Sequence, residues 1–176
     1  TMKKALMATA LAALVVGLIG AATVAADGGR KDHKARLSGF SEVPPISTIG
    51  SGWLKLRVNS SPDSISYELR YDNLTGVTAA HIHFGNTGGN GDPIAFLCGG
   101  GTKPACAAAG TTITGTILAS DILATTQGIA AGEFAEAVRA IRKGSTYVNA
   151  HTGTFAGGEI RGQIRHGWGK SGDHDD

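Results

Sequence analysis

The sequence predicts an all-β domain, an antiparallel Greek-key sandwich or barrel with one short helix, preceded by a signal peptide. Apolar and polar residues alternate with a period of two along several short segments, which is typical of half-buried strands. The 176 residues include 27 glycines, far above the usual ~7%, which suits a turn-rich β fold and disfavours a helical bundle. Only one segment shows helical periodicity instead.

The first 26 residues indicate an exported protein. Lys3 and Lys4 precede an apolar stretch, residues 5–20, that is short for a bilayer span. Residues 24–26 place small side chains before Asp27, as a cleavage site requires. We therefore expect a secreted or periplasmic protein with no stable membrane span after cleavage. The alternative is an uncleaved anchor.

The mature chain is predicted to form a single domain. Polar residues without apolar periodicity give a flexible lead-in over 27–34 and an acidic tail over 167–176, and the β domain itself occupies 35–166. About this number of residues can bury a genuine core without a scaffold of disulfides. No internal repeat indicates a second domain.

Seven strands follow from the alternation of apolar and polar residues. They are expected over 36–40, 53–58, 64–71, 77–84, 111–118, 147–151 and 159–165. The second and third are joined by the turn-forming sequence of residues 59–63, which predicts a hairpin. The helix is expected where Phe134, Ala137, Val138 and Ile141 recur at helical spacing, with Gly144 at its C-terminal cap.

Two cysteines, Cys98 and Cys106, stand on either side of a short glycine-rich segment. In an exported protein they are expected to form a disulfide, and the alternative is a pair of thiolate ligands for a soft metal. No cysteine then remains as a nucleophile. The sequence also lacks the GxSxG motif of a nucleophile elbow, which disfavours covalent hydrolase chemistry.

Net charge and glycine spacing disfavour two further classes of function, nucleic-acid binding and nucleotide binding through a phosphate loop. Lys3 and Lys4 leave with the signal peptide, so the mature chain carries equal numbers of basic and acidic residues, which disfavours a nucleic-acid partner. Residues 85–91 (GNTGGNG) lack both the lysine and the strand-to-helix context of a phosphate-binding loop. Their glycines are better explained by tight turns.

The candidate binding site is built from histidines. His81 and His83 lie two residues apart on a predicted strand, so both side chains project from one face. A third imidazole from another strand, His151, would complete a ligand set for one transition metal. The alternative is that His81 and His83 are buried or half-buried structural histidines, bonded to the backbone or to Asn149 and Thr152.

Three polar residues are candidates for the rim of this site: Asn149, Glu159 and Arg161. Asn149 is on the same predicted strand as His151. Glu159 and Arg161 form either an ion pair or part of the rim, and the structural role is favoured.

Five motifs in register resemble the CHRD domain, over about residues 35–166. They are LSGFSEVPP (37–45), YDNLTG (71–76), AHIHFG (80–85), YVNAHT (147–152) and GEIRGQI (158–164). The resemblance implies an extracellular domain, in chordin a tandem module of a morphogen antagonist and in bacteria a single exported copy. It suggests an interaction or structural module for an unidentified extracellular protein or polysaccharide, and self-association is open.

The histidine pattern also resembles the copper,zinc superoxide dismutase sandwich. That likeness implies that His81, His83 and His151 correspond to copper ligands. No further histidine lies between His83 and His151, so the metal-bridging ligand and the histidines of a zinc site are missing. The expectation is a single copper or zinc ion bound by a non-catalytic protein, rather than dismutase activity, with affinity falling as pH drops through about 6.5.

Overall fold

A computed structural model describes residues 32–60 and 63–167. The signal peptide, most of the lead-in and nearly all of the tail therefore lie outside the described residues. The elements, in chain order, are β1 (Asp32–Ser38), the 3-10 turn η1 (Gly39–Ser41), β2 (Ser51–Ser60), β3 (Asp63–Asp72), β4 (Val77–Phe84), β5 (Pro93–Cys98), β6 (Thr112–Leu118), the 3-10 turn η2 (Ala119–Asp121), α1 (Phe134–Arg142), β7 (Thr146–Thr152), β8 (Ile160–Gln163) and β9 (Arg165–His166).

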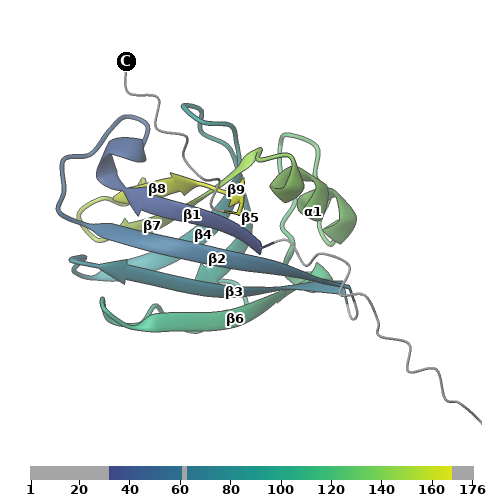
Figure 1. Ribbon diagram of the computed structural model, residues 1–176, viewed down its shortest axis with the longest axis horizontal. Helices are drawn as coiled ribbons and strands as arrows, with labels where there is room; N and C mark the ends of the chain where they lie inside the picture. Colours follow the sequence, from purple (N-terminus) through teal and green to yellow (C-terminus); the bar gives the residue numbers. More distant parts are fainter. Residues whose placement is uncertain (1–31, 61–62, 168–176) are drawn as a thin grey trace, which may run out of the picture.

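The strands form one antiparallel sheet that curls into a nearly closed barrel (Figure 1). Their order is β5-β4-β7-β8-β1-β2-β3-β6, and the short β9 pairs with β1. Strands distant in sequence, such as β4 and β7, are therefore neighbours. The predicted fold class, an all-β sandwich or barrel with one short α-helix, is confirmed.

The core fills the inside of the barrel and follows the predicted alternation. On β2 and β3, Leu54 pairs with Leu69 and Leu56 with Tyr67, and all four side chains are buried. Burying a side chain of this size contributes about 1.5–3 kcal/mol. Residues between these positions point outward, so each strand presents a second, outer face.

The helix forms where the sequence places it, at one end of the barrel (Figure 1). Its buried residues are Ala137, Val138, Ala140 and Ile141, which form one face. Gly144 has φ +72°, the left-handed conformation expected after a helix C-terminus. Within the described residues, no helix has the length and apolar character needed to cross a membrane.

Two features of the sheet differ from the sequence prediction. Strand β1 begins at Asp32 rather than at residue 36, so residues 32–34 are paired with β2 instead of belonging to the flexible lead-in. His33, within the segment expected to be a flexible lead-in, is only 2% exposed. Strand β5 was not predicted, because Pro93–Cys98 is apolar on both faces and therefore lacks alternation.

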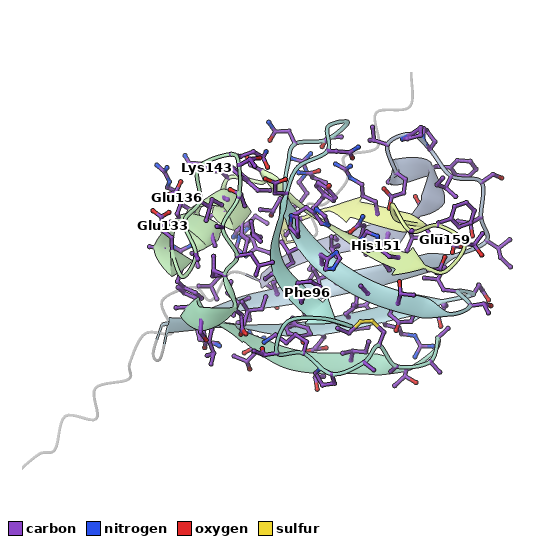
Figure 2. The ribbon with its side chains drawn as sticks, turned by 180° about the vertical axis from the view of Figure 1, so that it is seen from behind. Phe96, Glu133, Glu136, Lys143, His151 and Glu159 are labelled. Atoms are coloured by element: carbon purple, nitrogen blue, oxygen red, sulfur yellow. A yellow bond between two sulfur atoms is a disulfide. The ribbon has the colours of Figure 1, made fainter. Side chains whose placement is uncertain are left out.

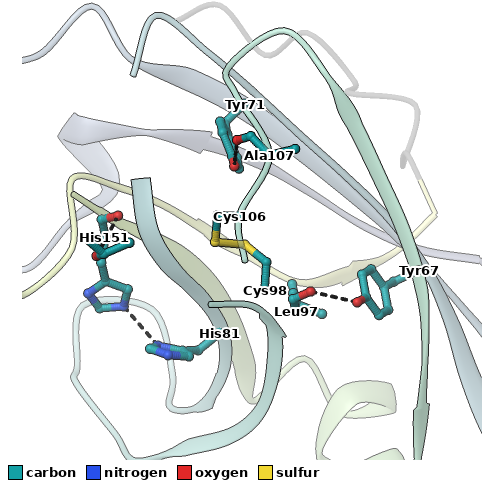
Figure 3. Close-up of a disulfide and its surroundings, with 9 residues drawn as sticks. Tyr67, Tyr71, His81, Leu97, Cys98, Cys106, Ala107 and His151 are labelled. Atoms are coloured by element: carbon teal, nitrogen blue, oxygen red, sulfur yellow. Dashed lines mark hydrogen bonds between the residues drawn. A yellow bond between two sulfur atoms is a disulfide. The ribbon is translucent and has the colours of Figure 1, made fainter. Parts of the chain in front are cut away.

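The predicted disulfide between Cys98 and Cys106 is present (Figure 3). Within the loop that it closes, Lys103 donates to Asp121 at 2.7 Å and to the backbone oxygen of Thr116. Tyr67 donates to the backbone oxygen of Leu97 at 2.7 Å. These bonds hold the β5 edge of the sheet against β3 and β6.

Candidate metal centre

Neighbouring strands β4 and β7 bring the three predicted histidines together. His81 and His83 share the outer face of β4. Ala80, which precedes them, and Ile82, which lies between them, point into the core. In the register of the two strands, His81 lies opposite Asn149, and His151 lies two residues further along β7 on the same face. Figure 2 views the molecule from this side, with His151 labelled.

The ring nitrogens converge on one small volume. One nitrogen from each of His81, His83 and His151 lies within 4.8 Å of the others. His81 Nδ1 and His151 Nε2 are 3.0 Å apart (Figure 3). Two donors on one ion with bonds of about 2.0–2.1 Å are at most about 4.1 Å apart, and about 3.3 Å apart at a tetrahedral angle. The widest pair, which involves His83, must therefore close by at least about 0.7 Å, and by about 1.5 Å for a tetrahedral site.

Backbone carbonyls orient two of the imidazoles. His83 Nδ1 lies 2.8 Å from the oxygen of Gly91, and His151 Nδ1 lies 2.9 Å from the oxygen of Ala156. Because a carbonyl only accepts, both Nδ1 atoms donate, and each neutral ring then carries its lone pair on Nε2. Such an outer bond to a carbonyl is the usual way of fixing a metal-ligating histidine.

Burial keeps these imidazoles uncharged at neutral pH. It lowers the pKa of His81 to about 4, with further lowering from the neighbouring charges of His151 and His83. Burial likewise lowers the pKa of His83 and of His151. Neutral imidazole is the form that ligates a metal. His81 Nε2 and His83 Nε2 are buried and have no hydrogen-bond partner among the described atoms.

Aromatic rings hold the histidines from the side. Phe96 on β5 meets His81 edge to face at 4.4 Å between ring centroids. Tyr147 stacks on His83 at 4.8 Å, and the Arg161 guanidinium lies 3.4 Å from the centroid of Tyr147. The spacing of residues in the sequence does not identify Phe96 or Tyr147 as part of the site. Tyr147 could have been found, since it lies two and four residues from Asn149 and His151 on one strand.

The three candidate rim residues lie in different surroundings. Asn149 belongs to the cluster, with its Oδ1 3.0 Å from His151 Nε2. Arg161 is buried and donates to Asn90 Oδ1 and to the oxygens of Asn86 and Gly89, so it anchors the glycine-rich 85–92 loop. Glu159 does not contact the histidines; its carboxylate accepts hydrogen bonds from the hydroxyls of Thr48 and Thr152, each at 2.7 Å. The Glu159–Arg161 ion pair is not observed among the described salt bridges.

A buried carboxyl, Glu42, lies behind Asn149. Burial raises its pKa, opposed by the charge of Arg161, the N–H of Val43 and the amide of Asn149. A methyl group at Gly158, which has φ +124°, would lie 2.5 Å from Glu42 Oε1 and 2.7 Å from Asn149 Nδ2. Only glycine therefore fits at this position without displacing one of them.

The donor set fits a first-row transition metal. Imidazole nitrogens suit zinc and copper, and three of them are a common protein ligand set for these ions. The unpartnered Nε2 of His83 supplies the independent evidence, because a buried imidazole nitrogen without a partner costs free energy that a bound ion would recover. The three-histidine cluster can thus hold one metal ion.

These features define a class of protein, an all-β barrel with a three-histidine cluster on its outer face. The family model of the CHRD domain matches residues 33–164, and the chain therefore belongs to the CHRD domain family. The family assignment made from the motifs is confirmed, and the domain is of an extracellular type. No curated protein and no solved structure matches the chain, and the likeness to copper,zinc superoxide dismutase is not confirmed.

Proposed function

We propose that this chain is an exported, non-catalytic CHRD-domain protein that binds one copper or zinc ion through His81, His83 and His151. The observation that carries the proposal is the convergence of three uncharged imidazoles on one point of the outer face. Rigid strands on both sides hold them there, which lowers the ordering cost of binding. The function would be storage or sequestration of the ion.

Four observations on the sequence and the structure support this assignment. The leader resembles a signal peptide, and CHRD domains are typically extracellular, which supports a secreted or periplasmic location. Between His83 and His151 there is no further histidine for a second metal, so dismutase chemistry is not proposed. The disulfide fits an oxidising compartment.

A second candidate function is an interaction module with purely structural histidines, for an extracellular protein or polysaccharide. Two large apolar side chains favour it: Phe40 is 75% exposed and Ile49 is 82% exposed, and both lie between β1 and β2. Exposed apolar residues of this size are typical of contact surfaces when they gather. The two functions differ in one respect, because the second gives no metal binding that depends on His83.

The test compares the mature wild-type protein with His83→Ala and with His166→Ala as a matched control. His166 is exposed and lies on β9, outside the cluster. Metal content is measured by elemental analysis after export, and zinc and copper affinity by calorimetry at neutral pH. Circular dichroism confirms that each variant is folded.

We expect one equivalent of metal in wild type and in His166→Ala, and affinity at least about 100-fold lower in His83→Ala, since a ligand is lost. A His83→Ala protein that binds as tightly as wild type would contradict the proposal. So would a wild-type protein that binds neither ion, and the interaction module would then be favoured.

A further inference from the structure

Asn149 is placed differently from the other polar residues of the outer face. It is 2% exposed, lies directly opposite His81 on the neighbouring strand, and points toward the same volume as the three imidazoles. Its Oδ1 is 3.0 Å from His151 Nε2. It also lies close enough to His83 to affect the pKa of that ring. Its side chain therefore approaches two of the three histidines.

The contact between Asn149 Oδ1 and His151 Nε2 is not itself a hydrogen bond between neutral side chains, although Nδ1 of His81 can donate to the same Nε2. His151 donates from Nδ1 to the Ala156 carbonyl, so the neutral ring presents a lone pair at Nε2. An amide oxygen 3.0 Å away presents another lone pair. Two acceptors facing each other repel, whereas a positive ion between them is attracted to both.

The opposite orientation of the Asn149 amide is disfavoured by Glu42. Asn149 Nδ2 and Glu42 Oε1 border the same small space, beside Gly158. A carboxylate oxygen accepts a hydrogen bond from an N–H, and turning the amide round would set its oxygen against the carboxylate instead. Nδ2 of Asn149 thus lies on the Glu42 side and Oδ1 on the histidine side, although Nδ2 does not reach hydrogen-bond distance of Glu42 Oε1.

The spacing also fits a shared ion. The oxygen of Asn149 and Nδ1 of His81 are each 3.0 Å from His151 Nε2. With bonds of about 2.0–2.1 Å, two donors 3.0 Å apart subtend about 95° at the metal, a normal angle between adjacent ligands. Asn149 Oδ1 and His81 Nδ1 are therefore each spaced from His151 Nε2 as adjacent ligands are, and the His83 ring must move closer to complete a set of three nitrogens and one oxygen.

We infer that Oδ1 of Asn149 is a fourth ligand, which encloses a zinc or copper ion with His81, His83 and His151. This inference rests on the proposed metal binding and sharpens it. Zinc sites with four protein ligands are closed and structural, whereas catalytic zinc sites keep one position for water or substrate. A closed site suits storage or sequestration rather than catalysis.

The test uses the mature protein and three substitutions. Asn149→Leu removes the oxygen at similar volume, Asn149→Asp replaces it with a charged oxygen donor, and His83→Ala removes a nitrogen ligand. Asn59→Leu, on β2, is the matched control, because Asn59 bonds to Ser64 and Ser66 outside the cluster. Zinc affinity is measured by calorimetry, and the Cu(II) form is examined by electron paramagnetic resonance with and without azide.

We expect Asn149→Leu to bind one zinc about 10- to 100-fold more weakly than wild type. Its Cu(II) spectrum should change on adding azide, which enters the vacated position, while the wild-type spectrum should stay the same. Asn59→Leu should match wild type. Asn149→Asp should bind zinc more tightly and change the Cu(II) spectrum, which keeps the inference testable if Asn149→Leu fails to fold.

Wild-type affinity and spectrum in Asn149→Leu would overturn the fourth ligand while leaving the three-histidine site intact. An unchanged Cu(II) spectrum in Asn149→Asp would overturn it equally. Wild-type affinity in His83→Ala is a different result, because it would contradict the metal function itself. The two failures are therefore distinguishable.

Discussion

The outer faces of two strand pairs in the same sheet differ in chemistry. On β2 and β3 the outward residues are charged and paired: Lys55 lies 3.7 Å from both Asp32 and Glu68, and Arg70 lies 2.8 Å from Asp72. On β4 and β7 the outward residues are imidazoles and an amide, which are covered and uncharged. Both faces arise from the same alternation along a strand.

The difference comes from the loops that cover one face. The 85–92 loop supplies the Gly91 oxygen to His83, and the turn after β7 supplies the Ala156 oxygen to His151. Covering removes water, and loss of water disfavours a charged imidazole. The charged side chains on β2 and β3 already neutralise one another. The imidazole nitrogens covered on β4 and β7 keep lone pairs that can bind an ion. Binding capacity thus depends on covering as well as on residue type.

The largest expected effect is the loss of folding stability at low pH, which is caused by the buried histidines on the covered outer face of β4 and β7. The folded pKa of His81 is about 4, below its ordinary value of 6.5, so the unfolded chain binds more protons between these values. The metal-free protein should therefore lose stability as pH falls from about 6.5 toward about 4. His83 and His151 are shifted in the same direction and should add to the loss. Urea unfolding at a series of pH values measures it.

Burial raises the pKa of Glu42, so the contribution of Glu42 to stability increases as pH falls, opposite to that of the histidines. A control is therefore needed. The His81→Gln variant removes the contribution of one histidine, and its stability should fall less steeply with pH than that of wild type. Equal slopes for the two proteins would contradict the lowered pKa. Metal affinity should also begin to fall only below pH 6.5, a lower range than histidine spacing alone predicts, because burial lowers the pKa of all three histidines.

A glycine beneath the covered face gives the next largest effect. Gly158→Ala places a methyl group against Glu42 and Asn149 at a positive φ, and should cost about 3 kcal/mol of unfolding free energy. Gly157→Ala is the matched control, because no atom lies within 4 Å of its added methyl. It should change stability by less than about 0.5 kcal/mol. Denaturant unfolding that found both variants equal would contradict the tight packing at Gly158.

The smallest effect is expected on the charged face. Lys55→Ala breaks two partly exposed ion pairs, which contribute little in water, so stability should change by about 0.5 kcal/mol or less. Zinc affinity should equal that of wild type. A loss of zinc binding in this variant would show that the two faces are coupled, contrary to the comparison above.

Much of the fold was predictable because alternation and turn chemistry are local. The outward positions of His81 and His83, the helix with Gly144 after it, and the pairing of Cys98 with Cys106 all follow from short stretches of sequence. The missing strand β5 has apolar residues on both faces, and such a run gives no period of two. Its assignment requires the neighbouring strand β4.

The site was predicted only in part, because its remaining contacts are long-range. Spacing identified the three histidines, and Asn149 was named as a rim residue. The stacking of Tyr147, the approach of Phe96 and the position of Glu42 depend on which strands and loops become neighbours. Glu159 was placed at the rim from its proximity in sequence to Arg161, yet its carboxylate bonds to Thr48 and Thr152 instead.

Anomalous diffraction from crystals of the zinc-loaded mature protein tests the central claim most directly. Data collected on both sides of the zinc absorption edge locate the ion without reference to any ligand. The predicted result is one peak at about 2.0–2.1 Å from a ring nitrogen of each of His81, His83 and His151. A protein that binds zinc only elsewhere, with no peak among these three rings, would contradict it.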